Sequence, residues 1–261
     1  MAKTAERSSE TDITVNPIFR QHLAAYEFAR QFASDKVVLD VGCGEGYGTN
    51  LLASAAKRVT GIDYSKQSVG KANKNYASDK TVFFCKDINR IDFPDESLEL
   101  IVAFQVIEHL SRPNTLLSKI KNLLKADGIF LLSTPNNKAS IIEHPYHYKE
   151  YDKETLKGLL DKYFSRVEIY GLCFSRKVAR FREKRKKESQ NILKLDPLKL
   201  HRLLPVFIRR TLFDLIAEKL SKKIYMEDKD LTAGVATSDF WVTPRQEEID
   251  SSIDLIAICW K

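Results

Sequence analysis

The sequence has no long uninterrupted apolar run. Charged residues break each apolar stretch well before the roughly 18 residues that a membrane-spanning helix needs. Residues 1–12, MAKTAERSSETD, are polar and lack the apolar core of a secretory signal. We therefore expect a cytoplasmic protein, which leaves contact with a membrane surface open.

The sequence is also poor in cysteine, and no two cysteines have the spacing of a metal site. Cys43, Cys85, Cys173 and Cys259 are far apart in the chain, with no C-x-x-C pair among them. Two of them, Cys85 and Cys259, lie in apolar runs, where a reduced thiol behaves as a small hydrophobic group. The pattern predicts neither a zinc site nor a disulfide framework.

Basic charge is concentrated in one segment. The whole chain carries +7, but residues 176–226 hold 16 Lys and Arg against 5 Asp and Glu, which gives that segment +11 and the remainder −4. Any attraction to nucleic acid or anionic lipid must therefore depend on this segment alone.

Short apolar runs alternate with helical stretches along most of the chain. Because strand and helix in alternation indicate a parallel sheet with crossover helices, we predict a doubly wound α/β fold. Its seven-stranded, mainly parallel sheet follows a leading helix over residues 16–32. The segment 176–226 reads as a helical insertion before the last strand, so that residues 1–175 and 227–261 form the core. The predicted strands are 36–40, 58–63, 81–87, 98–105, 128–135, 166–172 and 252–260.

A glycine-rich loop follows the first predicted strand, where residues 38–48 read VLDVGCGEGYG. The dinucleotide pattern G-x-G-x-x-G fails, since Tyr47 or Thr49 stands where its third glycine is required. A phosphate loop would need a lysine, and none lies between residues 42 and 52. Asp40 and Glu45 instead bring negative charge to the start of the next helix, where a phosphate would otherwise bind. The loop suits a ligand with an ammonium group.

Three acidic residues, Asp40, Asp63 and Asp87, end successive apolar runs at intervals of 23 and 24 residues. The ligand crevice of an open α/β sheet lies outside the carboxyl ends of its strands, so the three acids are expected along one edge of that crevice. Each alone could simply cap the following helix. Three in succession beside a glycine loop favour a ligand.

The motifs VLDVGCGEGYG, GIDYS, KDI and FQVIEHL together resemble the class I S-adenosylmethionine-dependent methyltransferases. Their set is similar to that of small-molecule or glycan enzymes such as ubiquinone methyltransferases, over residues 26–135. The resemblance implies that Asp63 holds the ribose hydroxyls and that Asp87 with Ile88 meets the adenine, which Tyr64 flanks. The other residues that it implies for the cofactor are Asp40, Gly42, Gly44 and Gly46 in the loop, Gln105 after the fourth strand, and Tyr26, which could equally only cover the sheet.

The first histidine near the predicted crevice is His109, in FQVIEHL. Methyl transfer from a sulfonium needs mainly positioning, and a base is required only where the acceptor must lose a proton, as a hydroxyl does. The resemblance makes His109 a candidate base, although the Glu-His pair serves as a structural element in many relatives.

The loop EHPYHYKEY, residues 143–151, offers His147 or Tyr148 as an alternative base and reads as either a substrate-facing lid or a plain surface loop. Glu143, His144 and His147 could bind a metal, but no partner cluster exists elsewhere, and we predict none.

The methyl acceptor is less clearly indicated. The Asp/Asn-Pro-Pro-aromatic and Pro-Cys motifs of nucleic-acid base methyltransferases are absent, so nucleic acid is a less favoured partner.

The insertion places an apolar stripe on a basic helix, which could cap the site or lie on an anionic membrane. Its LDPLKLHRLLP stretch loosely resembles enzymes of cell-surface polysaccharide assembly. We predict O-methylation of a glycan or other small molecule, with a quinone phenol, RNA, or a non-catalytic binding role as alternatives. The stripe comprises Ile208, Leu212, Leu215, Ile216 and Leu220.

Overall fold

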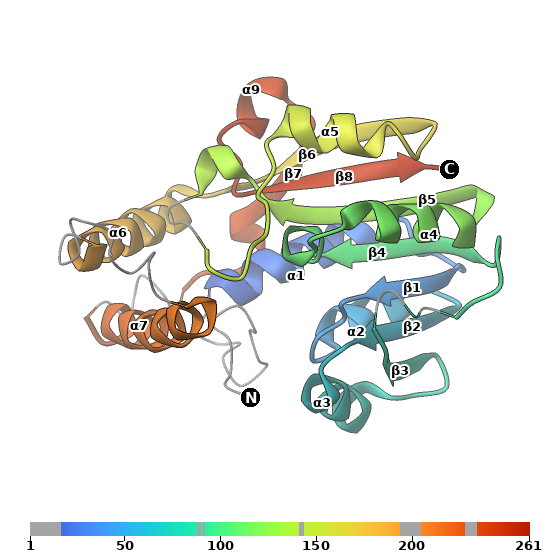
Figure 1. The fold of residues 1–261 in the computed structure, drawn as a ribbon, viewed down its shortest axis with the longest axis horizontal. Helices are drawn as coiled ribbons and strands as arrows, with labels where there is room; N and C mark the ends of the chain where they lie inside the picture. The colour runs from blue at the N-terminus through green and yellow to red at the C-terminus, as the bar shows by residue number, and fades with distance from the viewer. Residues whose placement is uncertain (1–16, 88–89, 91, 141–143, 194–204, 228–233) are drawn as a thin grey trace.

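The computed structural model describes residues 17–87, 90, 92–140, 144–193, 205–227 and 234–261. One sheet of eight strands organises the chain, in the order β3-β2-β1-β4-β5-β8-β6-β7 (Figure 1). The strands are β1 Val37–Val41, β2 Arg58–Asp63, β3 Thr81–Cys85, β4 Leu98–Phe104, β5 Leu124–Pro135, β6 Arg166–Phe174, β7 Phe240–Thr243 and β8 Asp254–Trp260.

The pairing confirms the predicted α/β class with a mainly parallel sheet. Neighbours from β3 through β5 are parallel, whereas β5–β8, β8–β6 and β6–β7 are antiparallel. The sheet has one strand more than the seven predicted. The additional strand, β7, is a four-residue edge strand whose Trp241 is 46% exposed, so it shows little of the alternation that marks a buried strand.

Helices cover both faces of the sheet. The predicted leading helix is α1, and two long helices, α6 and α7, occupy most of the predicted insertion. The α-helices are α1 Pro17–Arg30, α2 Tyr47–Ala53, α3 Lys66–Tyr76, α4 Pro113–Leu123, α5 Lys153–Leu160, α6 Arg176–Leu193, α7 Val206–Glu227 and α9 Gln246–Ile249. Short 3-10 turns are η3 Ile107–His109, η4 Asn137–Ala139 and η6 Thr237–Asp239.

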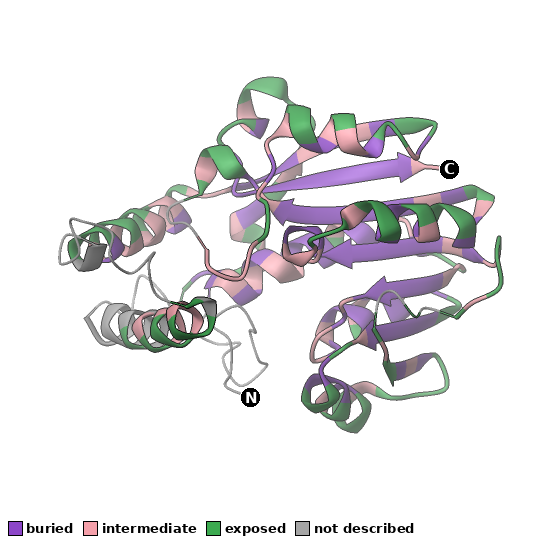
Figure 2. Cartoon of the chain, in the orientation of Figure 1, coloured by how far each residue is buried: buried purple, intermediate pink, exposed green. Residues whose placement is uncertain are grey.

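The central strands are buried on both faces (Figure 2). In β4, Ile101 and Ala103 pack into the core that α4 and α5 cover, whereas Leu100 and Val102 pack into the core that α1 and α2 cover. Successive strand residues point to opposite faces, so an unbroken apolar run fills both cores. This double burial fixes the carboxyl ends of the strands, where the site lies.

The helices α6 and α7 lie side by side beyond the edge to which the parallel strands point (Figure 1). They therefore stand next to the loops that follow β1, β2 and β4. Most of the LDPLKLHRLLP stretch lies outside the described residues. Within the described part of the chain, none of the helices is long and apolar enough to cross a membrane.

All four cysteines are free thiols. Cys43, Cys173 and Cys259 are buried, but Cys85 is exposed, contrary to the expectation that it packs as a small hydrophobic group. The cause is its place at the end of β3, the edge strand of the sheet, where no further strand covers it.

Candidate cofactor and acceptor site

A cavity of about 760 Å³ opens at the carboxyl ends of the parallel strands. Its walls come from the β1–α2 loop, the ends of β2 and β4, the lid loop (residues 144–151) and the helices α1, α6 and α7. This volume is ample for a nucleotide-sized ligand together with a small acceptor. The predicted cofactor residues that line it are Tyr26, Gly42, Gly44, Asp63, Tyr64, Asp87 and Gln105. Ile88 lies outside the described residues.

Gly44 and Asp63 form one corner of the cavity. Gly44 has a φ of +55°, and a Cβ added there would meet nothing within 4 Å. Its N–H donates to Asp63 Oδ2 at 3.1 Å, and the N–H of Ser65 donates to Asp63 Oδ1 at 2.7 Å. Because each carboxylate oxygen can accept a further bond, Asp63 remains able to bind two ligand hydroxyls.

Asp40 is not among the residues that line the cavity, and its contact with the cofactor stays a prediction. Its side chain is fully buried and accepts hydrogen bonds from Thr49 Oγ1 at 2.6 Å and from the Tyr26 hydroxyl at 3.1 Å. Burial raises the pKa of Asp40 to about 7, against the lowering effect of these two bonds. Asp40 therefore acts through Tyr26, which it positions at the cavity wall.

Gly46 also lies behind the cavity wall. Its φ is +89°, and a Cβ there would approach the Cβ of Ala72 to 2.7 Å and the ring of Phe83 to 2.9 Å. The absence of a side chain at Gly46 allows α2 to begin close to α3 and β3, and the predicted contact of Gly46 with the cofactor stays a prediction. Glu45, whose negative charge was expected to disfavour a phosphate, forms an ion pair with Lys71 at 2.6 Å.

Tyr26 closes one side of the cavity from α1. Its ring lies over Gly48, where an added Cβ would come within 2.1 Å of it, and makes an edge contact with Phe104 at 4.8 Å between centroids. The fourth glycine of the loop thus makes room for an aromatic ring rather than for a ligand.

Gln105 follows β4 with an unusual backbone. Its φ is +55°, although it is not glycine, and its N–H donates to the Ser133 carbonyl at 2.9 Å. Such left-handed residues cost free energy and tend to cluster at functional sites. The turn directs the chain from β4 into η3, which carries His109.

Two further cofactor candidates lie at the open side of the cavity. Tyr64 follows β2 directly and is 71% exposed, so its ring offers an uncovered face to a ligand. Asp87 follows β3 and is also exposed. Their predicted contacts with adenine stay predictions.

His109 lines the cavity on η3, between the glycine loop and the lid loop. Its Nδ1 lies 3.2 Å from the backbone oxygen of Tyr146. A carbonyl can only accept, so this bond places the proton on Nδ1 and leaves Nε2 as the basic nitrogen in the neutral ring. The side chain therefore has the tautomer that a general base requires.

His147, the second predicted catalytic histidine, is not among the residues that line the cavity, and its catalytic role stays a prediction. Its side chain is 8% exposed, and Nδ1 lies 2.7 Å from Glu150 Oε1. Burial raises the pKa of Glu150, but hydrogen bonds from His147 and Ser140 outweigh this effect and lower it overall. His147 packs edge-on against His109 at 5.0 Å between centroids, so it supports that ring.

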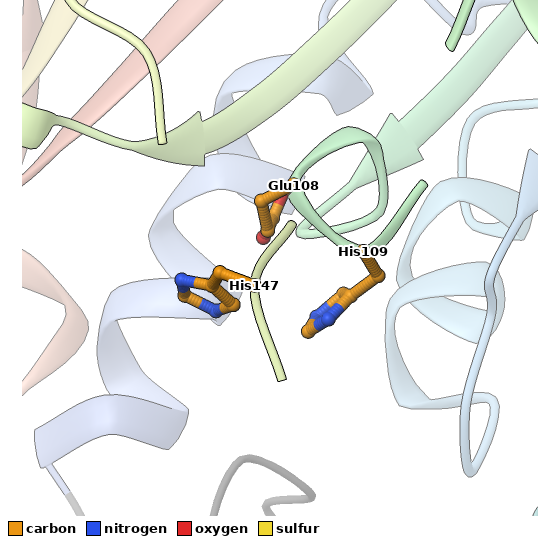
Figure 3. Close-up of side chains that lie close together, drawn as sticks. All are labelled: Glu108, His109 and His147. Carbon is orange, nitrogen blue, oxygen red and sulfur yellow. The ribbon is translucent and has the colours of Figure 1, made fainter. Parts of the chain in front are cut away.

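Glu108, His109 and His147 lie close together (Figure 3), with one donor atom of each within 4.8 Å of the others. Two ligands of a tetrahedral zinc ion lie roughly 3.4 Å apart at Zn–N distances near 2.1 Å. The three groups would need to approach one another further to share such an ion. Glu108 is buried and accepts from Thr134 Oγ1 at 2.9 Å, which ties η3 to β5.

The acceptor end of the cavity is formed by the lid loop and by α6 and α7. His144, Tyr146 and Tyr148 of the lid line it. The Tyr146 hydroxyl donates to Asp214 of α7 at 2.6 Å, and the Arg210 guanidinium lies 4.8 Å from the centre of the Tyr146 ring. The lid loop is thus held by α7, as the cap interpretation of the insertion requires.

Arg182 and Arg185 line the cavity from α6 and are not among the site residues predicted from the sequence. In the sequence they are two of many cations in a basic segment. Their three-residue spacing places them on one helical face, but only the position of α6 shows that this face turns inward.

The fold and the site define a class of protein that binds a nucleoside-type ligand at the carboxyl edge of a parallel sheet. A family model described as a methyltransferase domain matches residues 39–132. The protein of Mycolicibacterium smegmatis named "Probable S-adenosylmethionine-dependent methyltransferase" is 30% identical over 264 residues, covering 98% of this chain and 93% of that protein. The chain belongs to the S-adenosylmethionine-dependent methyltransferases.

Other similarities are more partial. The ubiquinone biosynthesis O-methyltransferase of Glaesserella parasuis is 32% identical over 150 residues, which cover 53% of this chain and 63% of that protein. The crystal structure of a methyltransferase from Archaeoglobus fulgidus matches with a TM-score of 0.56 at 18% identity, covering 92% of this chain and 94% of that one. A Haemonchus contortus N-methyltransferase structure with S-adenosylhomocysteine gives 0.58 at 17% identity, covering 93% and 53%. These structures support the fold.

The cavity residues fit the cofactor that this family uses, S-adenosylmethionine. The open space beside Gly44 admits a ligand against the backbone, and Asp63 offers a fixed carboxylate with free lone pairs. Tyr64 adds an exposed aromatic face on the same side. The predicted enzyme class and cofactor are therefore confirmed, while the individual residue contacts stay predictions.

Proposed function

We propose that this methyltransferase acts on a hydroxyl group of a small molecule or glycan. The observation that carries the proposal is that His109 lines the cavity with its Nδ1 at 3.2 Å from the Tyr146 carbonyl, a bond that leaves Nε2 as the basic nitrogen of the neutral ring. A hydroxyl must lose its proton during methylation, and a positioned imidazole is suited to take it. The named ubiquinone O-methyltransferase relative supports an oxygen acceptor, a quinone phenol included.

S-adenosylmethionine, when bound, supplies a methyl group on a positively charged sulfur. In the proposed reaction Asp63 and the Gly44 backbone hold the cofactor, and Tyr64 and Asp87 contact its adenine ring. Tyr26, fixed by Asp40, closes the cavity over the other end. The acceptor oxygen would form its new bond to the methyl carbon as the bond from that carbon to sulfur breaks, which leaves S-adenosylhomocysteine, and the hydroxyl proton would pass to His109 Nε2. The lid loop and α7 form the wall of this end of the cavity.

Labelled methyl transfer onto matched alcohols and amines tests the proposal. The purified protein is incubated with methyl-labelled S-adenosylmethionine and pairs of acceptors that differ only in a hydroxyl or an amino group, drawn from glycosides and phenols. We expect label on oxygen in the hydroxyl member of a pair. Label on nitrogen alone would contradict O-methylation while leaving the family assignment intact.

We also propose that α7 contacts an anionic membrane surface. Its outward face exposes Phe207, Ile208, Leu212 and Leu215, at 70%, 38%, 42% and 53%. Ile216, which we predicted in this stripe, is half-buried and so less exposed than these four residues. The side chain of Leu220 lies outside the described residues. The opposite face holds the lid through Arg210 and Asp214, so α7 can cap the site and present an apolar stripe together. The charge of +11 over residues 176–226 suits an anionic bilayer.

Sedimentation with vesicles tests this contact. The chain should bind vesicles of phosphatidylcholine mixed with phosphatidylglycerol more strongly than phosphatidylcholine alone, and binding should fall as salt is raised. Replacing Leu212 and Leu215 together by Gln should reduce it severalfold. Trp241→Gln, which removes an exposed aromatic residue from β7, is the matched control and should have no effect. Equal binding by all three proteins would contradict the proposal.

A further inference from the structure

One face of α6 turns two arginines into the cavity. Val178, Phe181, Arg182, Arg185 and Ser189 line it at the three- and four-residue intervals of one helical face. They lie in the acceptor end, with the lid loop and α7, whereas Gly44, Asp63 and Tyr64 belong to the cofactor end.

Arg182 is anchored by groups of the protein. Its Nη2 donates to the Ala139 carbonyl at 2.8 Å, and its guanidinium lies 5.2 Å from the centre of the Phe174 ring. Asp254 is its nearby opposite charge, but burial raises the pKa of Asp254 to about 6, and its carboxyl also accepts from Gln21 Nε2 at 2.7 Å. Arg182 is therefore fixed in place by neutral groups, with Asp254 as the nearby opposite charge among the described residues.

Arg185 has no such partners. It is half-buried, and among the described residues it makes neither a hydrogen bond nor an ion pair. Burial lowers the pKa of Arg185, and the like charge of Arg182, one helical turn away, lowers it further. A partly buried guanidinium without an acceptor in the protein keeps its hydrogen-bond donors available for an anionic ligand.

Among the described residues that line this end of the cavity, the other charged groups are Arg210 and Asp254. Arg210 of α7 also lines the cavity, and it bonds the Pro145 carbonyl at 3.3 Å rather than a carboxylate. The acceptor end therefore presents three arginines against the single carboxyl of Asp254 among the residues that line it. Planar guanidinium groups bind carboxylate and phosphate oxygens through paired hydrogen bonds.

We infer that the methyl acceptor carries an oxyanion, a phosphate or a carboxylate, which binds Arg185 and Arg182 of α6 while the methylated hydroxyl faces His109. This inference rests on the proposed O-methylation for the position of the hydroxyl. The oxyanion site itself depends only on α6 and can be tested without methyl transfer. Arg185 supplies the open hydrogen-bond donors, and Arg182 adds charge from a fixed position.

Binding of small aromatic probes to the full chain saturated with S-adenosylhomocysteine tests the site. Phenyl phosphate, benzoate and neutral benzyl alcohol are titrated separately by calorimetry at low salt. We expect at least one anionic probe to bind about ten-fold or more tightly than benzyl alcohol. Phenyl phosphate binding better than benzoate would identify the acceptor as a phosphate, and the reverse order as a carboxylate. Equal binding of all three probes, or no binding of either anion, would overturn the inference.

Matched variants locate the effect. Arg185→Gln should weaken the anionic probe by about 10- to 100-fold, the effect of losing charged hydrogen bonds. Arg180→Gln removes the same charge from the exposed side of α6 and should bind like the wild type. Affinity for S-adenosylhomocysteine and thermal stability should be retained in both, which separates a lost ligand contact from misfolding. Unchanged anion binding in Arg185→Gln would overturn the assignment. Anion binding without methylation of any hydroxyl would instead contradict only the proposed O-methylation.

Discussion

The Nδ1 atom of His109 lies 3.2 Å from the backbone oxygen of Tyr146. This contact joins η3, at the end of the fourth strand, to a lid loop 37 residues later in the chain. It fixes the tautomer of the imidazole, and it makes the basic nitrogen depend on the position of the lid. The contacts that α7 makes with this loop and the tautomer of His109 are therefore linked through one hydrogen bond.

Replacing His109 by Gln should slow methyl transfer to a hydroxyl acceptor by about 10²- to 10⁴-fold, the usual contribution of a general base. Gln can keep a hydrogen bond to the Tyr146 carbonyl but cannot take up the proton. The wild-type rate should fall toward acid pH, where a protonated imidazole no longer accepts, and the variant should lose this dependence. Single-turnover rates with labelled cofactor across a pH series provide the measurement.

The matched control is binding of S-adenosylhomocysteine, which should be unchanged because His109 lies at the acceptor end. A variant that retains the full transfer rate would rule out His109 as the base and leave the lid contact as a structural feature only.

Gly44→Ala should impair the cofactor site more than the fold. The added methyl group meets no protein atom within 4 Å, so the cost to the free energy of unfolding is that of a left-handed φ, about 1 kcal/mol. The methyl group would occupy cavity space beside Asp63, so affinity for S-adenosylhomocysteine should drop about ten-fold or more. Calorimetric titration measures the affinity, and urea unfolding measures the stability.

Gly70→Ala is the companion variant, since Gly70 lies in α3 with open space around it and away from the cavity. It should bind the cofactor normally and be slightly more stable, because alanine favours a helix. If Gly44→Ala and Gly70→Ala bound S-adenosylhomocysteine with equal affinity, the cofactor would not occupy the open space beside Gly44.

The sequence indicated the cofactor half of the site well because that half follows local rules. Strand-end acids and a glycine loop are placed by the alternation of elements, and Asp63 and Gly44 lie in the cavity as expected. The direction of the Asp40 side chain could not be predicted in the same way. Its position after an apolar run says that it ends near the crevice, but whether the carboxylate faces the ligand or the core depends on Tyr26 and Thr49.

The acceptor half could not be predicted to the same depth because long-range packing forms it. Nothing local distinguishes Arg185 from the neighbouring cations of α6, and only the placement of that helix shows which of them face the cavity. The two histidines of the lid loop also look equivalent in sequence, yet His144 lines the cavity while His147 turns to Glu150. The β7 strand was missed because it is short and lies at the sheet edge.

Metal removal distinguishes two uses of the cluster that includes Glu108, His109 and His147. If His109 acts as a base, dialysis against a chelator should leave the transfer rate within about two-fold of its starting value, because proton transfer of this kind needs no cation. Added Mg²⁺ or Zn²⁺ should not raise it further. Activity that is lost with the chelator and restored by one of these ions would contradict the base assignment and identify the cluster as a cation site.

The buried carboxyl of Asp40 should make the chain less stable as the pH rises toward neutrality. Its pKa is about 7 in the folded protein and near 3.8 in an unfolded chain, so the folded state binds the proton more tightly. The stability that this proton contributes is fully present below about pH 4 and is lost as the pH rises through 7, with a slope of at most about 1.4 kcal/mol per pH unit.

Asp40→Asn keeps the size of the side chain but does not titrate. The free energy of unfolding of this variant, relative to the wild type, should therefore rise between about pH 4 and pH 7 and level off above. Urea unfolding of both proteins over that range measures the difference, from which Asp254, with its own pKa raised to about 6, cancels because both proteins contain it. A difference that stays constant with pH would show that Asp40 is already ionised in the folded protein, held by Thr49 and Tyr26 despite its burial.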